Sequence, residues 1–131
     1  MTRVKTLKQL KEELRDLFSL FIRLRDSDMY GYGKCITCGR RNHYKKMDAG
    51  HYIKRQYLAT DFDERNVNLQ CKHCNAFEQG SDAKYRVAID EKWGKGTAEM
   101  LEIKKFNKAK YGRFEYEILI KEYEDKLKEM L

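Results

Sequence analysis

Two cysteine pairs, Cys35 with Cys38 and Cys71 with Cys74, are the residues of this chain best suited to bind a metal ion. Each pair has two residues between its members, the spacing that lets neighbouring thiolates reach one tetrahedral Zn²⁺. Every cysteine of the chain falls into one of these pairs, which favours a shared site over four unrelated buried cysteines. Because four thiolates fill the coordination sphere, we expect one structural Zn²⁺ rather than a catalytic one.

An acid, a histidine and a carboxamide stand between these pairs or directly beside them. His51 carries an imidazole, which titrates near neutral pH and can take a proton from water as a general base must. Asp48 and Asn75 offer oxygen atoms, the ligands that a hard catalytic cation such as Mg²⁺ or Mn²⁺ prefers. Together these groups suit the metal-dependent hydrolysis of a phosphodiester bond. The ordinary alternatives are a surface histidine and an asparagine that merely caps a helix. His43 and His73 also remain alternative ligands for the zinc ion.

The order of these residues resembles a known nuclease motif. The chain reads Asp48-Ala-Gly-His51-Tyr-Ile-x-Arg55, then Asn66-x-Asn-Leu-Gln-Cys71-x-x-Cys-Asn75. This pattern is similar to that of HNH (ββα-metal) nucleases, and its CxxCN ending resembles endonuclease VII of phage T4. Over about residues 35–95 the chain resembles most closely the NinG (Rap) recombination endonucleases of lambdoid phages.

The resemblance implies a role for each matching position. His51 would be the general base, and Asp48 with Asn75 would hold one Mg²⁺ or Mn²⁺. Asn66 would tie the following loop to the strand and thereby orient the histidine. Arg55 would grip a phosphate, since its guanidinium can donate two parallel hydrogen bonds, and the neighbouring Lys54 would bind DNA. Cleavage in this family leaves 5′-phosphate and 3′-hydroxyl ends.

One position departs from the usual motif, in which an acid or a second histidine directly precedes the general base. Here Gly50 precedes His51, and Asp48 stands three residues back, so the two would face opposite sides of a regular strand. A β-bulge at Ala49–Gly50 would bring both side chains to one ion, and we expect such a bulge.

Around these residues we expect an α+β fold, mostly helical, that forms a single domain over residues 1–131. Apolar residues at spacings of three and four predict a long helix within residues 1–30: Leu7, Leu10, Leu14, Leu17, Phe21 and Leu24. A zinc-bound HNH nuclease core is expected over 35–93 and C-terminal helices over 97–131. The strands and later helices should span Met47–Ile53, Val67–Gln70, Cys74–Trp93 with an interruption at Gly80, Thr97–Lys110 and Tyr116–Met130.

The charge of the chain indicates a polyanionic partner. The formal net charge is +7, and residues 1–47 hold 12 Lys and Arg against 5 Asp and Glu, which accounts for the whole excess. We therefore expect DNA as the partner, bound in part by Arg40, Arg41, Lys45 and Lys46. A solvated helix face rich in lysine is the alternative reading of the same charges.

The sequence contains no apolar run long enough to cross a membrane, so we expect no membrane partner and a cytoplasmic protein. The resemblance implies a phage protein in the bacterial host cell. The function that we expect is metal-dependent, structure-selective cleavage of branched DNA such as Holliday junctions during phage recombination. A general HNH nicking endonuclease and a non-catalytic zinc-finger module are the alternatives. A homodimer is expected because symmetric cleavage of a junction needs two active sites. A monomer whose two apolar stripes pack on each other is the alternative, and other recombination proteins are candidate partners.

Overall fold

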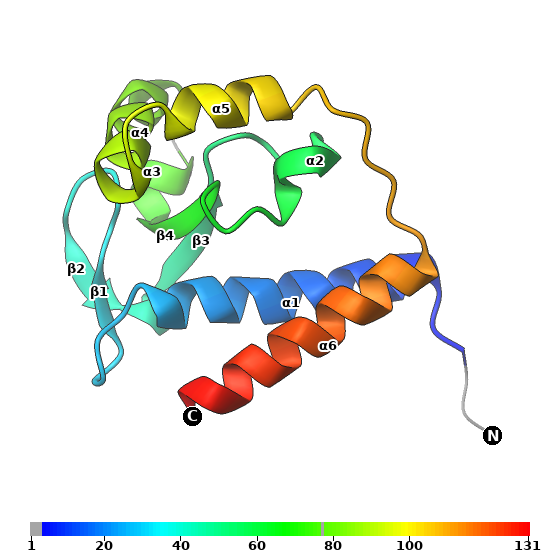
Figure 1. Ribbon diagram of the computed structural model, residues 1–131. Helices are drawn as coiled ribbons and strands as arrows, with labels where there is room; N and C mark the ends of the chain where they lie inside the picture. Colours follow the sequence, from blue (N-terminus) through cyan, green and yellow to red (C-terminus); the bar gives the residue numbers. More distant parts are fainter. Residues whose placement is uncertain (1–3, 77) are drawn as a thin grey trace. The chain divides into compact units, whose positions relative to one another are not determined.

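The computed structural model describes residues 4–76 and 78–131, which form helices and two small antiparallel sheets (Figure 1). The coarse expectation of a mixed fold rich in helix is therefore confirmed. The chain divides into two compact units. The first comprises the chain up to Phe21 together with Lys110–Leu131, and the second comprises Ile22–Ala109.

The elements follow the order α1 (Leu7–Arg25), β1 (Tyr32–Lys34), β2 (Arg41–His43), a 3₁₀ helix η1 (Tyr44–Lys46), β3 (Met47–His51), α2 (Leu58–Asp61), β4 (Val67–Cys71), α3 (Lys72–Ala76), α4 (Glu78–Trp93), α5 (Thr97–Lys104) and α6 (Arg113–Met130). The long first helix, the two central strands and the last helix lie where the sequence predicts them. None of the described helices is long and apolar enough to cross a membrane.

Three boundaries differ from the expectation. The helix after the second strand begins at Lys72 rather than near Cys74, and α4 continues through Gly80 without an interruption. The helix that starts at Thr97 ends at Lys104 rather than Lys110. A single glycine costs a helix only about 1 kcal/mol, which packing of the rest of α4 offsets.

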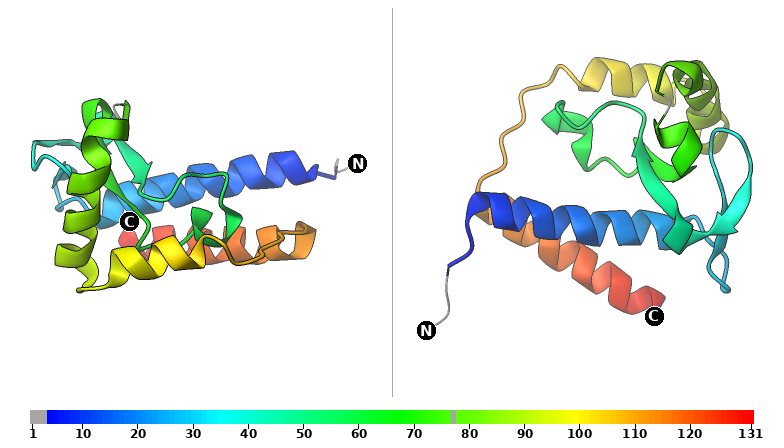
Figure 2. Two further views of the ribbon diagram at one scale, coloured as in Figure 1. Left: turned by 90° about the horizontal axis from the view of Figure 1, so that it is seen from above. Right: turned by 180° about the vertical axis from the view of Figure 1, so that it is seen from behind.

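In the first unit, α1 and α6 run alongside each other (Figure 2). Thr6 begins α1 by accepting a hydrogen bond from the Gln9 amide, while the Gln9 side chain accepts one from the Thr6 amide, a reciprocal cap. The rings of Phe18 and Tyr123 meet edge to face with centroids 5.1 Å apart. The two apolar stripes therefore pack on each other within one chain.

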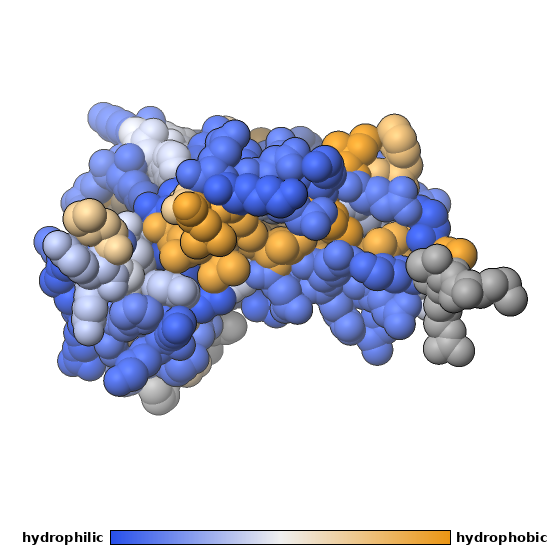
Figure 3. Space-filling model, turned by 90° about the horizontal axis from the view of Figure 1, so that it is seen from below, coloured by the Kyte–Doolittle hydropathy of each residue, from blue (hydrophilic) through white to orange (hydrophobic). Residues whose placement is uncertain are grey.

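The expected stripe of α1 is only partly buried. Leu10, Leu14 and Phe18 are buried, but Leu7 is 49% exposed, so the expectation of a buried stripe is wrong at its first residue. The buried face follows the positions that meet α6, and these drift around the helix because its period is 3.6 residues. An apolar band bordered by hydrophilic residues stays visible from outside (Figure 3).

In the second unit, β3 and β4 form a hairpin whose strands pair antiparallel from Met47 opposite Cys71 to His51 opposite Val67. The shorter pair β1–β2 is a second hairpin, which is not among the predicted strands. The core beside the strands contains Tyr85 and Ile89, among other apolar residues. Tyr85 of this core contacts β3 through a hydrogen bond from its hydroxyl to the carbonyl of Gly50.

The bulge expected at Ala49–Gly50 is absent, and that prediction is wrong. Five consecutive residue pairs keep one register along β3 and β4, so Asp48 and His51 lie on opposite faces of the strand. Gly50 has a different reason for being glycine. A Cβ at this position would lie 2.0 Å from the Oε1 atom of Gln70, which crosses over the strand there.

Candidate metal centre and candidate active site

The four cysteines converge on one point. Their sulfur atoms all lie within 4.8 Å of one another, and those of Cys38 and Cys71 are 3.8 Å apart. Tetrahedral Zn²⁺ with bonds of about 2.3 Å separates its sulfur ligands by roughly 3.8 Å. The residues thus fit one ion such as zinc, and the four sulfurs leave it no open position. A metal here would serve the fold rather than bind substrate.

Both cysteine pairs present their sulfurs in the same local geometry. The amide of Cys38 donates to the sulfur of Cys35, and the amide of Cys74 donates to the sulfur of Cys71. Gly39 completes the first turn with a φ of +76°, a conformation that side chains disfavour. The peptide N–H groups thus point at the sulfurs, as thiolate ligands require.

Without a cation the thiols of Cys35 and Cys74 do not ionise together. Burial would raise the pKa of Cys35, but hydrogen bonds from backbone amides outweigh it and lower that pKa to about 7. Burial raises the pKa of Cys74, and hydrogen bonds with the neighbouring cysteines raise it further. A bound divalent cation would supply the charge that lets all four become thiolates.

His51 ends β3 with its ring held by the loop that follows. Its Nε2 atom lies 2.9 Å from the backbone oxygen of Asp61 and 3.0 Å from the Oδ1 atom of the same residue. A carbonyl oxygen only accepts hydrogen bonds, so Nε2 carries the proton. In the neutral ring, Nδ1 is then the nitrogen free to accept a proton, which is what a general base needs.

Asp61 is buried completely, and its position depends on Asn66. The Asn66 side chain accepts from the amide of Ile53 at 2.7 Å and donates to the carbonyls of Ile53 and Thr60, both at 3.0 Å. These bonds tie the loop to the segment that follows β3. One of them binds Thr60, the residue directly before Asp61. This placement matches the loop-tying position that the resemblance assigns to Asn66, whose role in orienting His51 stays a prediction.

A hollow of about 420 Å³ opens at the end of β3, and we call it the His51 hollow. It brings together four of the residues singled out from the sequence: His51, Lys54, Arg55 and Asn75. Ala49 and Gln56 complete its lining. The hollow therefore combines a base, two cations and a carboxamide in one place.

Asp48 does not line this hollow. Its carboxylate accepts a hydrogen bond from the Nδ2 atom of Asn75 at 3.0 Å and pairs with the ammonium of Lys72 at 2.9 Å. Asn75 thus links Asp48 to the hollow that contains His51. The pair fits a hard cation in part: Asp48 is already paired with a cation, but Asn75 turns its nitrogen toward the acid and would have to flip its carboxamide to offer an oxygen ligand.

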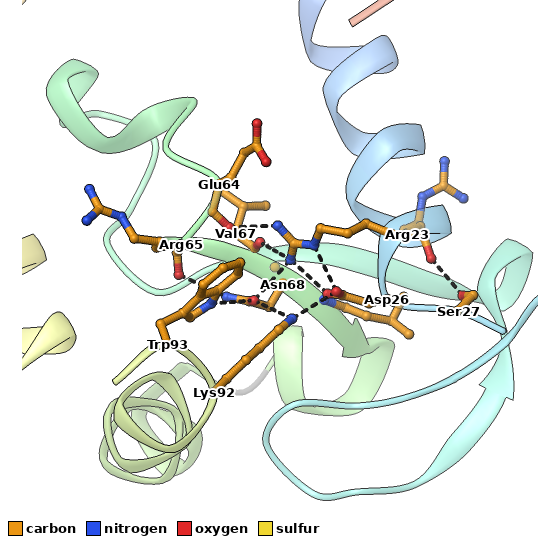
Figure 4. Close-up of polar contacts among 12 residues, drawn as sticks. Arg23, Asp26, Ser27, Glu64, Arg65, Val67, Asn68, Lys92 and Trp93 are labelled. Atoms are coloured by element: carbon orange, nitrogen blue, oxygen red, sulfur yellow. Dashed lines mark hydrogen bonds and ion pairs between the residues drawn. The ribbon is translucent and has the colours of Figure 1, made fainter. Parts of the chain in front are cut away.

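Behind β3, a buried polar network supports the strand pair (Figure 4). Asn68 of β4 is fully buried, and its Oδ1 atom accepts hydrogen bonds from Arg25, Lys92 and Trp93 at 2.8–3.1 Å. Asp26 pairs with both Arg25 and Lys92 at 2.8 Å. The network fixes the carboxamide of Asn68 in one orientation.

The other side of the Asn68 carboxamide is connected to β3 through one tyrosine. The Nδ2 atom of Asn68 donates to the hydroxyl of Tyr85, and that hydroxyl donates to the carbonyl of Gly50 at 2.6 Å. Burial would raise the pKa of Asp26, but hydrogen bonding and charge from Arg25, with help from Lys92, hold it below its ordinary value. The acid thus stays charged and the network intact at neutral pH.

The basic residues assigned to DNA lie outside the His51 hollow. Arg40 and Arg41 stand at β2, with Arg41 paired to Asp28 at 3.2 Å, and Lys45 and Lys46 form part of η1. All four are exposed. They can meet a phosphate backbone, but they do not complete the candidate active site.

The sequence did not single out Asp61, and it did not predict the contact that Tyr85 makes. Three acids stand in the loop after His51, and spacing does not distinguish Asp61 from the others. Chemistry could have predicted an acid in this loop, because a histidine that acts as a base needs a partner to fix its protonated nitrogen. Tyr85 shows no such signal, since an aromatic residue within a helix ordinarily indicates core packing.

Comparisons with known proteins agree on one group. The family described as Bacteriophage Lambda NinG protein matches residues 1–131. Protein ninG of Salmonella phage P22 is 32% identical over 122 residues, which cover 91% of this chain and 56% of that protein. Protein ninG of Escherichia phage lambda is 31% identical, with the same coverage. The chain thus spans about half the length of these curated relatives. No solved structure shows a significant match.

Proposed function

The chain belongs to the NinG family of bacteriophage proteins, and we propose that it is a metal-dependent endonuclease of the HNH type that cuts branched DNA. The observation that carries the proposal is the contact between His51 and Asp61. It leaves Nδ1 as the proton acceptor in a hollow that Arg55 and Asn75 also line. These groups match the needs of phosphodiester hydrolysis.

In this proposal His51 removes a proton from the attacking water. Asp61 and Asn66 act through His51, because they hold its ring and the loop beside it. Arg55 and Lys54 bind the oxygens of the phosphate that is cut. Arg55 is exposed and can reach two oxygens of one phosphate at once.

One Mg²⁺ or Mn²⁺ belongs to the proposal, with Asp48 and Asn75 as its protein ligands. When bound, the cation stabilises the negative charge that develops on the phosphate and the leaving oxygen. Lys72 must swing away from Asp48 to admit it. The side chain of Lys72 is 68% exposed, so this ion pair is weak and the movement costs little.

Binding of the strand would rest mainly on phosphate contacts. Arg40, Arg41, Lys45 and Lys46 are exposed at or directly before β2 and in η1, and the chain carries a net charge of +7. Affinity should therefore fall steeply with salt. Selectivity for a junction rests on the resemblance to recombination endonucleases, and the setting would be the cytoplasm of an infected bacterium.

A homodimer is part of this proposal, since paired cuts across a two-fold junction need two sites. The apolar band in Figure 3 supports it, because exposed apolar surface often marks an interface. Because α1 and α6 already pack on each other within one chain, a monomer is the alternative. Sedimentation should give twice the 15.7 kDa mass of one chain, and a single-chain mass at micromolar concentration contradicts the dimer.

The deciding experiment measures cutting of a synthetic four-way junction and of a linear duplex with Mg²⁺ or Mn²⁺. We expect the wild type to cut the junction and His51→Ala to bind it without cutting. His43→Ala is the matched control, because His43 lies on β2 outside the hollow. It should cut like the wild type.

The rival functions predict different outcomes of the same assay. Equal cutting of duplex and junction would support a general HNH nicking endonuclease and remove the claim of junction selectivity. If wild type and His51→Ala bind equally and neither cuts with any divalent metal, the chain is a non-catalytic zinc-finger module.

A further inference from the structure

A second hollow, also of about 420 Å³, lies next to the His51 hollow and shares Lys54 with it. We call it the Phe106 hollow, after the phenylalanine that follows α5 and lines it together with Tyr57 and Lys105. All of these residues belong to the second unit. The two hollows are thus neighbours that meet at Lys54.

The aromatic residues of this hollow are presented to solvent. Phe106 is 75% exposed, and its ring meets that of Tyr57 edge to face with centroids 6.3 Å apart. A phenylalanine in this state stabilises the fold little, because most of its apolar surface stays in water. An exposed ring offers a flat face, which is what a nucleic-acid base stacks on.

The charges around these rings suit a polyanion. The ammonium of Lys105 lies 5.0 Å from the ring centroids of both Tyr57 and Phe106. The two acids of the hollow are each matched, since Glu102 pairs with Arg86 at 2.8 Å and Asp82 with Lys54 at 3.8 Å. The hydrogen bond from Arg86 lowers the pKa of Glu102, so this pair stays charged. Lys105 therefore adds a positive charge beside the rings.

We propose that the Phe106 hollow binds one unpaired DNA base beside the phosphate held in the His51 hollow. The DNA ligand rests on the function proposed above. Phe106 stacks on the base, and Lys105 contacts the phosphate of the same nucleotide. A base inside an intact duplex cannot expose its face, so the hollow selects DNA with an unpaired position. This would link the aromatic residues to a preference for branched substrates.

The test measures DNA binding by the full chain without added divalent metal and without chelator, so that zinc stays bound and nothing is cut. The probe is a duplex with one unpaired 2-aminopurine, whose fluorescence falls when the base stacks on a ring. We expect Phe106→Ala to weaken binding about five-fold or more and to abolish the quenching. Phe106→Trp, which keeps an aromatic face, should retain both.

A matched control removes another exposed phenylalanine. Phe114 of α6 is 71% exposed but does not line this hollow, so Phe114→Ala should bind and quench like the wild type. An uninterrupted duplex should bind Phe106→Ala and wild type alike. If Phe106→Ala quenches as well as the wild type, or weakens duplex and unpaired DNA equally, the base site is excluded.

Because the binding assay needs no cutting, its result is independent of catalysis. A wild type that quenches the probe but cuts no DNA supports the base site and contradicts the proposed nuclease. A wild type that cuts, with Phe106→Ala unchanged in binding, supports the nuclease and excludes the base site.

Discussion

The hydroxyl of Tyr85 donates a 2.6 Å hydrogen bond to the carbonyl of Gly50, the residue directly before His51. Tyr85 is 2% exposed, and its hydroxyl also accepts from Asn68 at 3.3 Å. A helix side chain therefore connects the buried network on β4 to the strand that carries the candidate base. The position of His51 depends on a contact made 34 residues later in the chain.

Replacing Tyr85 by phenylalanine removes this bridge without changing the size of the ring. We expect Tyr85→Phe to lower the free energy of unfolding by about 1–2 kcal/mol, because two buried polar groups lose a partner. We also expect slower cutting, since the carbonyl of Gly50 loses its hydrogen bond and the strand that carries His51 is held less firmly. Denaturant unfolding and single-turnover cleavage check this. Tyr52→Phe is the control, because the Tyr52 hydroxyl contacts Glu102 and not the strand.

Asp61→Asn tests whether Asp61 fixes the proton of His51 on Nε2. An amide can donate to Nε2, which would move the proton to Nδ1 and remove the base that faces water. We expect cutting to fall by about 100-fold or more with little loss of DNA binding. Glu64→Gln removes the same charge from the same loop and should cut normally. Equal cutting by Asp61→Asn and wild type would show that this contact has no catalytic role.

The cysteine cluster predicts one bound metal ion per chain and a fold that depends on it. Cys38→Ser should lower the zinc content and the melting temperature, because an incomplete set of thiolates binds zinc weakly. His73→Ala, inside the second pair, should keep the zinc if all four ligands are sulfur. Metal analysis and thermal denaturation check both. A chain that chelation strips of metal without any change in melting would contradict the structural role.

We expect Asp63 to account for part of the loss of stability at acid pH. Burial would raise its pKa, but hydrogen bonds from Arg65 and Lys104 lower it from 3.8 to about 2. Because the folded pKa lies below the unfolded one, the carboxylate stabilises the fold above pH 4, and this gain disappears between pH 4 and pH 2. The gain is about 2 kcal/mol, since the side chain is 6% exposed.

Unfolding experiments on Asp63→Asn check this sign. The variant should be less stable than the wild type at pH 6, and the difference should shrink as the pH falls toward 2. Loss of metal at acid pH affects both proteins, so it cancels in the difference between their free energies of unfolding. A constant difference over this range would show that Asp63 is not held as a carboxylate.

Much of the local structure was predictable. The period of the apolar residues located α1, β3 and β4, because helices and strands place side chains on one face at different intervals. The spacing of the cysteines predicted their convergence for a similar reason, since two residues between ligands suit one tetrahedral ion. The first hairpin, β1–β2, was not predicted because its strands are three residues long and carry no alternating pattern of apolar and polar residues.

The candidate site was predictable in its members but not in its arrangement. His51 and Asn75 line one hollow, whereas Asp48 does not line it because the register of β3 and β4 stays regular. No local pattern distinguishes a regular strand from a bulged one here. The side chain of Gln70, which fills the space above Gly50, comes from the partner strand.

The cysteine spacing, the order of His51, Asn66 and Asn75, and the helical periods are local properties, and the sequence alone determined them. Tertiary structure decided which acid contacts His51, which nitrogen of its ring carries the proton, and which aromatic residues stay exposed. These depend on contacts such as that of Tyr85 with Gly50, 35 residues away in the chain, and that of Asp61 with His51 across a folded loop. Such contacts form only when packing brings the segments together, so spacing along the chain does not encode them individually.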